Sequence, residues 1–401
     1  MSKATLFRII QFLKNLNQVL NSKPACCAAG RFQIPIDGSI STSRLEIGAW
    51  RLELPKMGIY RYFCGIVLLS VGLTACWGDK NKDIPDVSAI PVDYNIHRFE
   101  EALFALDTND VHTGIASLEQ KYPDFTDFYL QNILQVKKPW DTTGVYKQHI
   151  KGFLTYPFTQ QLYDTTQIVF HDFSEVEQRL KQGFQFYKYY FPEEELPDIY
   201  TFISEFSYGI VLPPIENTIG IGLDLFLGKD YPYYYYPPLS LPAYIARTQD
   251  QAHLPAKVFD GMIDDLVGEA KGSNFLDIII HNGKKLYALD HILPYEPDSI
   301  KLGFTEVQTN WCAENELEMW AFFLEEELLY SNEYKKFKSL VSDSPFATGM
   351  PPEAPGKAGN WVGWQIVKAY MQRQPETTLQ ELVAIKDAQE IFSKSRYKPR
   401  N

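Results

Sequence analysis

The fold is decided by one stretch of the chain, Thr218-Ile-Gly-Ile-Gly-Leu-Asp-Leu-Phe-Leu-Gly228. Its large aliphatic residues occupy every second position. Such alternation is typical of a β-strand with one buried face, so the stretch predicts a strand over 218–228. Gly220 and Gly222 lie on the opposite face, where another backbone or a ligand could lie close. Together with Asp224 they form our first candidate ligand or partner surface.

Most of the remaining sequence has helical periodicity. Apolar residues recur every three or four positions, which predicts helices over 254–270, 274–293, 305–330, 360–373 and 378–395. The clearest helix starts at Ser174-Glu-Val-Glu177, a predicted capping box, and Pro192 ends it. A second strand is predicted over 198–206. The predicted fold class is α+β, mostly helical, with a small central sheet.

Two aromatic groups are further candidates for a ligand or partner surface. The loop Tyr231-Pro-Tyr-Tyr-Tyr-Tyr-Pro-Pro238 holds five tyrosines between stiffening prolines, and such rings stack well on sugars and extended peptides. The alternative is that these rings cover the small sheet. Two tryptophans flank Gly363. The alternative to a ligand or partner surface here is that both rings pack in the core, against the gap left by the glycine. The candidate side chains are Tyr233, Tyr234, Tyr235, Trp361 and Trp364.

An internal segment has the three parts of a bacterial lipoprotein signal. A short region with Arg61 follows Met57, an apolar run extends over 62–71, and Leu73-Thr-Ala-Cys76 matches the lipobox. The apolar run is shorter than the roughly 18 residues that a transmembrane helix needs. We therefore expect cleavage before Cys76 and a covalent diacylglycerol lipid on its thiol. We expect no other cofactor and no metal.

This signal divides the chain into four parts. We expect residues 1–56 to be an upstream extension outside the native protein, 57–75 the signal peptide, 76–95 a lipid-anchored tether and 96–401 a single domain. Without residues 1–75 the chain keeps 29 basic and 47 acidic residues, a net charge of −18. So acidic a protein repels nucleic acid. Besides Cys76 it keeps Cys312 alone, an expected inert thiol, and no intrachain disulfide can form.

Several segments together resemble the gliding motility lipoprotein GldB family of Bacteroidota. They are His97-Arg-Phe-Glu-Glu-Ala-Leu-Phe104, Tyr189-Tyr-Phe-Pro192, the stretch 218–228, Asn282-Gly-Lys-Lys-Leu-Tyr287 and Gly359-Asn-Trp-Val-Gly-Trp-Gln-Ile-Val-Lys-Ala-Tyr370. The resemblance covers essentially the whole mature chain. It implies a protein of the cell envelope, anchored by lipid to the inner or outer membrane, with the outer favoured, and facing the periplasm or cell surface. The implied partners are the membrane and other envelope proteins of the gliding apparatus.

The layout is also similar to predicted zinc peptidases with a zincin-type fold. In these an edge strand, here 218–228, precedes a helix with a His-Glu-x-x-His motif. The corresponding helix of this chain, 255–269, contains no histidine. The resemblance therefore implies a zincin-like scaffold that has lost its metal. A zinc site assembled from His253, His281 and Asp264 or Asp265 is the alternative.

We therefore expect an envelope lipoprotein without catalytic residues, an accessory or assembly component of gliding motility and of the associated secretion machinery. One alternative is a membrane-tethered metallopeptidase or glycan-acting hydrolase with an irregular site. Another is a peptide- or glycan-binding module that uses the glycine-rich strand and the tyrosine loop.

Overall fold

The structure is a computed structural model that describes residues 84–136 and 145–400. The predicted upstream extension, the signal peptide and the lipid-attachment residue Cys76 lie outside the described residues. These expectations, and the proposed division of the chain, stay predictions.

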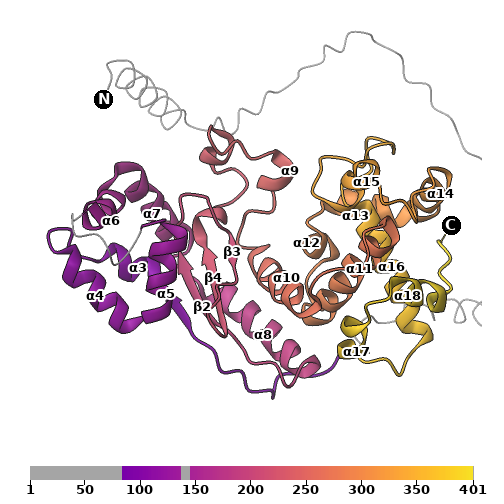
Figure 1. Ribbon diagram of the computed structural model, residues 1–401, viewed down its shortest axis with the longest axis horizontal. Helices are drawn as coiled ribbons and strands as arrows, with labels where there is room; N and C mark the ends of the chain where they lie inside the picture. Colours follow the sequence, from indigo (N-terminus) through magenta and orange to yellow (C-terminus); the bar gives the residue numbers. More distant parts are fainter. Residues whose placement is uncertain (1–83, 137–144, 401) are drawn as a thin grey trace, which may run out of the picture. The chain divides into compact units, whose positions relative to one another are not determined.

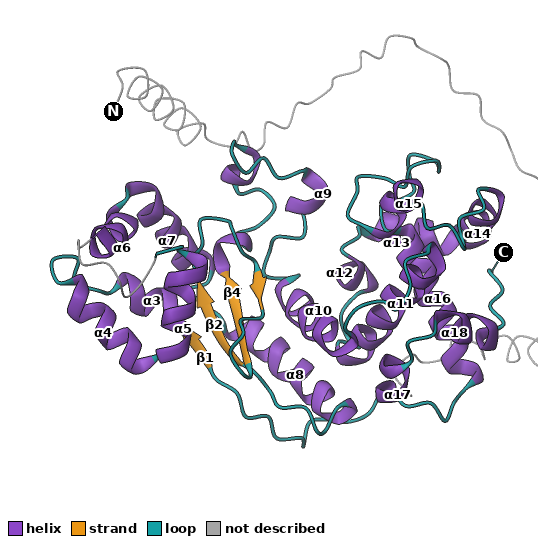
Figure 2. Cartoon of the chain, viewed as in Figure 1, coloured by secondary structure: helices purple, strands orange, loops and turns teal. Residues whose placement is uncertain are grey.

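Within the described residues, four short strands form a mixed sheet in the order β1-β2-β4-β3 (Figure 2). The strands are β1 (Ile96–Arg98), β2 (Asp198–Phe202), β3 (Ile210–Val211) and β4 (Thr218–Gly222). β2 runs parallel to both β1 and β4, with Ile199 opposite Ile96 and Ile219. β3 runs antiparallel to β4, with Ile210 opposite Ile221.

Both predicted strands exist, and both end earlier than predicted. β2 ends at Phe202, and β4 ends at Gly222 because Leu223–Leu225 form the 3-10 turn η2. Residues 223–227 are buried like the strand before them, so the alternation of apolar residues does not mark its end. β4 also lies between β2 and β3. It is therefore not the edge strand that the zincin resemblance implied.

The predicted α+β class, mostly helical with a small sheet, is confirmed. The helices before β2 are α3 (Phe99–Phe104), α4 (Val111–Lys121), α5 (Pro123–Phe128), η1 (Tyr129–Ile133), α6 (Val145–Thr155), α7 (Pro157–Val169) and α8 (Ser174–Tyr190). Those after the sheet are η3 (Pro232–Tyr235), α9 (Ala243–Ala246), α10 (Leu254–Val267), α11 (Phe275–Ile292), α12 (Asp298–Leu302), α13 (Glu306–Glu314), α14 (Glu316–Glu325), α15 (Tyr334–Val341), α16 (Ala358–Arg373), α17 (Leu379–Ala384) and α18 (Ala388–Ser395).

The predicted helices cover the right regions, but two of the five predicted over 254–395 are broken. The region 378–395 contains α17 and α18, which are separated by residues 385–387. The region 305–330 contains two helices, α13 and α14, because the chain breaks at Asn315, whose side-chain amide donates to the carbonyl of Trp311 at 2.8 Å. α8 begins at Ser174 as predicted, but the capping box is wrong. The N–H of Ser174 donates to the carboxylate of Asp172 at 2.9 Å, and the residue before the helix is Phe173.

The sheet separates two hydrophobic cores. Alternate residues of a strand point to opposite faces, so β2 supplies Ile199 to the larger core and Phe202 to the smaller one. The smaller core is built from aromatic residues of α3 to α5, such as Phe99 and Phe125, whose ring centroids lie 5.1 Å apart. Figure 1 shows α3 to α7 on one side of the sheet and α8 and α10 on the other.

Residues 84–95, the described part of the predicted tether, pack along α8. Val87 is buried, and the side-chain amide of Gln185 donates to the carbonyl oxygens of Ser88 and Ile90 at 3.2 and 3.3 Å. The ring of Tyr94 packs on Phe184 with 4.6 Å between centroids. This part of the predicted tether is therefore in contact with the domain, because Val87 and Tyr94 find apolar neighbours there.

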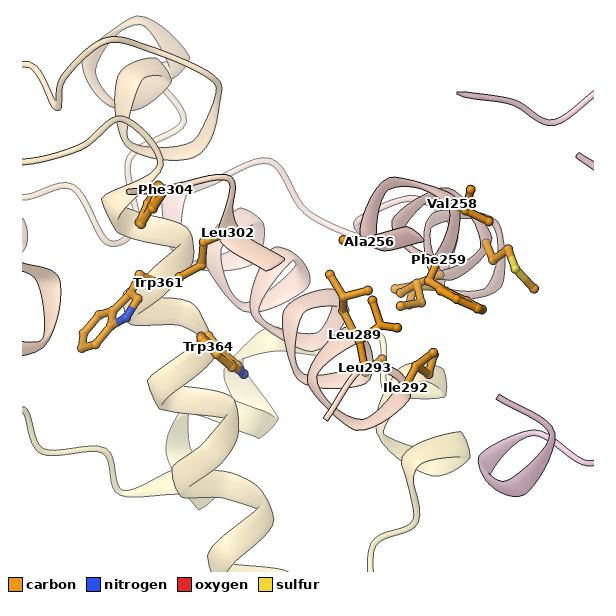
Figure 3. Packing of buried hydrophobic residues seen from close by; sticks show 14 of the residues in the cluster. Ala256, Val258, Phe259, Leu289, Ile292, Leu293, Leu302, Phe304, Trp361 and Trp364 are labelled. Atoms are coloured by element: carbon orange, nitrogen blue, oxygen red, sulfur yellow. The ribbon is translucent and has the colours of Figure 1, made fainter. Parts of the chain in front are cut away.

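The helices α11 and α16 cross at a pair of glycines. A Cβ atom on Gly363 would lie 2.5 Å from the carbonyl carbon of Ile279, and one on Gly283 would lie 2.8 Å from the backbone nitrogen of Trp364. Glycine is required at both positions because the two backbones leave no room for a side chain. Figure 3 shows Trp364 between α16 and α11.

Candidate functional site

The candidates on the central strand do not form a ligand surface, because Gly220, Gly222 and Asp224 are all buried. A Cβ atom on Gly220 would lie 2.5 Å from Cγ2 of Val211, and one on Gly222 would overlap the carbonyl oxygen of Tyr208. Gly220 therefore makes room for the side chain of Val211, and Gly222 makes room for the backbone of Tyr208. The expectation of a ligand there is wrong, since the chain itself fills the space.

Asp224 fixes the loop between β2 and β3. Its carboxylate accepts the backbone N–H groups of Ser204 at 3.2 Å and Phe206 at 2.5 Å. Burial raises the pKa of Asp224 to about 7, although these hydrogen bonds act in the opposite direction. The contacts give this carboxylate a structural role.

The tyrosine loop is divided between core and surface. Tyr234 is fully buried, donates its hydroxyl to the carbonyl oxygen of Asp224 at 3.0 Å and accepts the N–H of Leu227 at 2.9 Å. Tyr233 is half-buried and packs edge-on against Phe158, with ring centroids 5.0 Å apart. Tyr235 is exposed. Tyr234 thus anchors the loop, and the candidate surface is reduced to Tyr233 and Tyr235.

Both candidate tryptophans are core residues. Trp361 and Trp364 are buried on α16, and the ammonium group of Lys368 lies 3.3 Å from the ring centroid of Trp364. The alternative of core packing around Gly363 is therefore correct. Trp361 is 5% exposed and Trp364 is fully buried, which does not agree with their assignment to a ligand or partner surface.

The histidines named for a zinc site lie in different places. The ring Nδ1 of His253 donates to the carboxylate of Asp250 at 2.7 Å, whereas His281 lines a separate small hollow beside Lys284. Burial lowers the pKa of His281 to about 4. Asp264 pairs with Lys285. Among residues 84–136 and 145–400, no three His, Cys, Asp or Glu side chains gather as a metal site would require.

The remaining cysteine behaves as expected from its position in a helix. Cys312 is fully buried in α13, and burial raises the pKa of its thiol to about 12. A thiol with so high a pKa is a poor nucleophile.

A polar cleft lies where α10, α11, α12 and the start of α16 meet. It consists of two adjoining hollows of about 340 and 310 Å³. The residues that line both hollows are Asp260, Lys301, Leu302, Asp343 and Lys357. The first hollow extends to Asn282 and Lys285 of α11, and the second extends to His253 and Lys257 near the start of α10. We call it the lysine cleft, after Lys257, Lys285, Lys301 and Lys357.

Three of these lysines have carboxylate partners. Lys301, whose side chain is 2% exposed, pairs with Asp290 and lies 3.1 Å from the carboxylate of Asp298. Lys357 pairs with Asp343 at 2.6 Å, and Lys285 pairs with Asp264. These ion pairs connect the helices around the cleft and hold the three ammonium groups in place.

Lys357 also has an unusual backbone. It precedes α16 with φ of 66°, a left-handed conformation that favours glycine or asparagine. Its N–H donates to the carbonyl oxygen of Ser339 at 2.9 Å. A non-glycine residue in this conformation is held there by its surroundings, and such positions are often functional.

Lys257 differs from the other three lysines. It is partly buried, and within the described residues no carboxylate lies within salt-bridge distance of its ammonium group. Burial and the nearby charge of Lys357 lower the pKa of Lys257, and Asp343 and Asp260 offset this in part. Lys257 is thus a cation without a fixed counter-ion.

The charges of the cleft are nearly balanced. Its lining carries four lysines and two aspartates, and three more aspartates, Asp264, Asp290 and Asp298, pair with Lys285 and Lys301. The ammonium group of Lys257 is the one that these pairs leave available to an anion among the described residues.

A family model described as "Gliding motility protein GldB" matches residues 80–399. The chain belongs to this family. No curated protein and no solved structure matches it. Membership confirms the resemblance to GldB and makes the chain a gliding-motility-related protein. The likeness to zincin-type peptidases stays a prediction.

The match to GldB includes both cores and the whole lysine cleft. No helix in the described part of this GldB-family chain is long and apolar enough to cross a membrane. Sequence reasoning identified His253 and Asp264 near the cleft and missed all four lysines. The positions 257, 285, 301 and 357 follow no spacing motif, so no local signal could have identified them.

Proposed function

We propose that this GldB-family protein is a lipid-anchored protein of the cell envelope that serves gliding motility as a non-catalytic accessory or assembly component. One observation carries the proposal. The family match begins at residue 80, four residues after the lipobox residue Cys76. Lipid on Cys76 would therefore anchor the whole region that defines the family.

The start of the described chain supports a short anchor. Ile84 lies eight residues after Cys76, a stretch that spans at most about 28 Å. Ile84 lines a cavity together with Tyr190 and Tyr295. Tyr295 is 57% exposed, and such amphipathic rings suit a membrane–water interface. In this proposal the end of α8 faces the membrane, with the outer membrane favoured.

The charge arrangement supports a role without catalysis. Three lysines of the cleft are engaged in ion pairs with aspartates, and the ring of His253 is hydrogen-bonded to Asp250. Groups that transfer protons in catalysis need access to a substrate and a pKa near the working pH. Paired charges of this kind stabilise an arrangement of helices instead.

The expected partners are other envelope proteins of the gliding apparatus and of the associated secretion machinery. Tyr235 and Tyr236, 44% and 51% exposed, offer aromatic side chains of the kind enriched at protein interfaces. Their contact with such partners is part of the proposal.

The anchor is tested by Cys76→Ala. We expect this variant to remain uncleaved and to take up no lipid, because no other thiol follows the apolar run. Cells are labelled with an alkyne fatty acid, and the protein is isolated and examined for label. Label that persists in Cys76→Ala would refute the lipobox assignment.

The non-catalytic role is tested by colony spreading at matched protein level. We expect Asp264→Asn, Asp265→Asn and His281→Gln to spread like the wild type. Gly363→Leu should abolish spreading, because a large side chain cannot fit between α16 and α11. If one of the polar substitutions stops spreading while the protein stays folded and abundant, the role is catalytic.

A further inference from the structure

We propose that the lysine cleft binds a small ligand carrying an oxyanion, either a carboxylate or a phosphate, and that Lys257 contacts this group. The inference goes beyond the function proposed above and does not depend on the lipid anchor.

The size and lining of the cleft fit a small polar ligand. Its two hollows, of about 340 and 310 Å³, are within the range of small-molecule sites. Thr248, Gln249 and Ser342 add uncharged polar groups to the charged ones. The lining comes from α10, α11, α12 and the chain before α16, so the site is formed by the folded domain and not by one loop.

The charge that an anion would meet in the cleft is that of Lys257. The ammonium groups of Lys285, Lys301 and Lys357 are already engaged by aspartates. A partly buried ammonium group that is not engaged attracts an anion more strongly than one in open solvent, because the surrounding protein screens its charge less than water does.

Lys257 is the residue of the cleft that we expect to contact the oxyanion. Lys285, Lys301 and Lys357 each have an aspartate partner, whereas Lys257 has none among the described residues. A partly buried cation without a partner lowers the stability of the folded state. An oxyanion between Lys257 and Lys357 would supply the missing counter-charge and relieve the repulsion between the two lysines.

The substitution Lys257→Met separates binding from folding. It keeps the apolar stem of the side chain and removes the charge. If Lys257 serves a ligand, the variant loses affinity and is at least as stable as the wild type. If the lysine has a structural role, the variant melts at a lower temperature.

The experiment uses the full-length protein in detergent and isothermal titration at low ionic strength. The two oxyanion compounds are inorganic phosphate and N-acetyl-alanyl-alanine, and the C-terminal amide of the dipeptide is the uncharged control. The matched control variant is Lys335→Met, on an exposed position of α15. We expect one oxyanion to bind saturably, Lys257→Met to weaken binding roughly tenfold or more, and Lys335→Met to leave it unchanged.

The outcome also distinguishes the two sources of the oxyanion, since phosphate and the peptide carboxylate are tested separately. The proposal is wrong if neither phosphate nor the peptide carboxylate binds, or if Lys257→Met binds them like the wild type. It is also wrong if phosphate does not bind and the peptide amide has the same affinity as the peptide carboxylate. If Lys257→Met does not fold, Lys257→Arg decides the question. Arginine retains the charge, so binding must persist in that variant.

Discussion

The close crossing of α11 and α16 predicts how much stability the protein loses when one methyl group is added at Gly363. In Gly363→Ala the new Cβ atom would lie 2.5 Å from the carbonyl carbon of Ile279. The carbonyl oxygen of Ile279 lies closer still. An ordinary carbon–carbon contact is about 3.5 Å, so the two helices must separate locally by more than about 1 Å. The atom that is contacted belongs to the backbone and cannot rotate away as a side chain would.

The cost follows from two opposing contributions. Overpacking in a core typically costs about 1–3 kcal/mol, and contact with a backbone favours the upper end of this range. Alanine in a helix gains about 1 kcal/mol over glycine, which leaves a net loss of about 2 kcal/mol. For a domain of this size the loss corresponds to a fall in Tm of about 3 °C.

The assay is thermal unfolding followed by far-UV circular dichroism, with Gly152→Ala as the control. Gly152 lies in α6, and a Cβ atom there would have no neighbour within 4 Å. The control should therefore be as stable as the wild type or more stable by up to about 1 kcal/mol. If Gly363→Ala melts at or above the wild-type temperature, the helices do not pack as closely as described.

Three further predictions concern charge and metal content. Burial raises the pKa of Asp224 to about 7, above its value in the unfolded chain. The folded protein therefore binds this proton more tightly than the unfolded chain does, and it loses stability as the pH rises toward 7. In urea unfolding between pH 5 and 8, the wild type should lose stability with rising pH more steeply than Asp224→Asn. Lys301→Met should lower the free energy of unfolding by about 1–2 kcal/mol. The value is modest because Asp290 and Asp298 are partly exposed. If the variant is as stable as the wild type, the two ion pairs contribute nothing to stability. Elemental analysis of the dialysed protein should give well below one zinc ion per chain, and one zinc that is lost on His281→Ala would contradict this.

The sequence was sufficient to predict those parts of the fold in which a long pattern repeats. The helices α10, α11 and α16 each carry an apolar stripe over several turns, and their predicted bounds differ from the structure by few residues. β1 and β3, with three and two residues, are too short to show any period. They exist because their neighbours in the sheet accept their hydrogen bonds.

The candidate sites were harder to predict because burial of a side chain depends on distant parts of the chain. The glycines of β4 correctly indicated a close approach. The approaching groups are the side chain of Val211 at Gly220 and the carbonyl of Tyr208 at Gly222, and not a ligand. Tyr234 and Tyr235 are neighbours with the same chemistry, yet one is buried and the other exposed. The pattern of the loop contains nothing that separates them.

The lysine cleft and the crossing of α11 and α16 at Gly283 and Gly363 are physically connected. Asn282 precedes Gly283 on α11, and its amide donates to Asn360, three residues before Gly363, at 2.9 Å. Both asparagines line the first hollow of the cleft. A separation of the helices in Gly363→Ala would stretch this hydrogen bond and widen the hollow. Gly363→Ala should therefore reduce both stability and affinity for an oxyanion, whereas Lys257→Met should reduce affinity alone. Equal affinity in Gly363→Ala and the wild type would show that the ligand is held entirely in the second hollow, around Lys257.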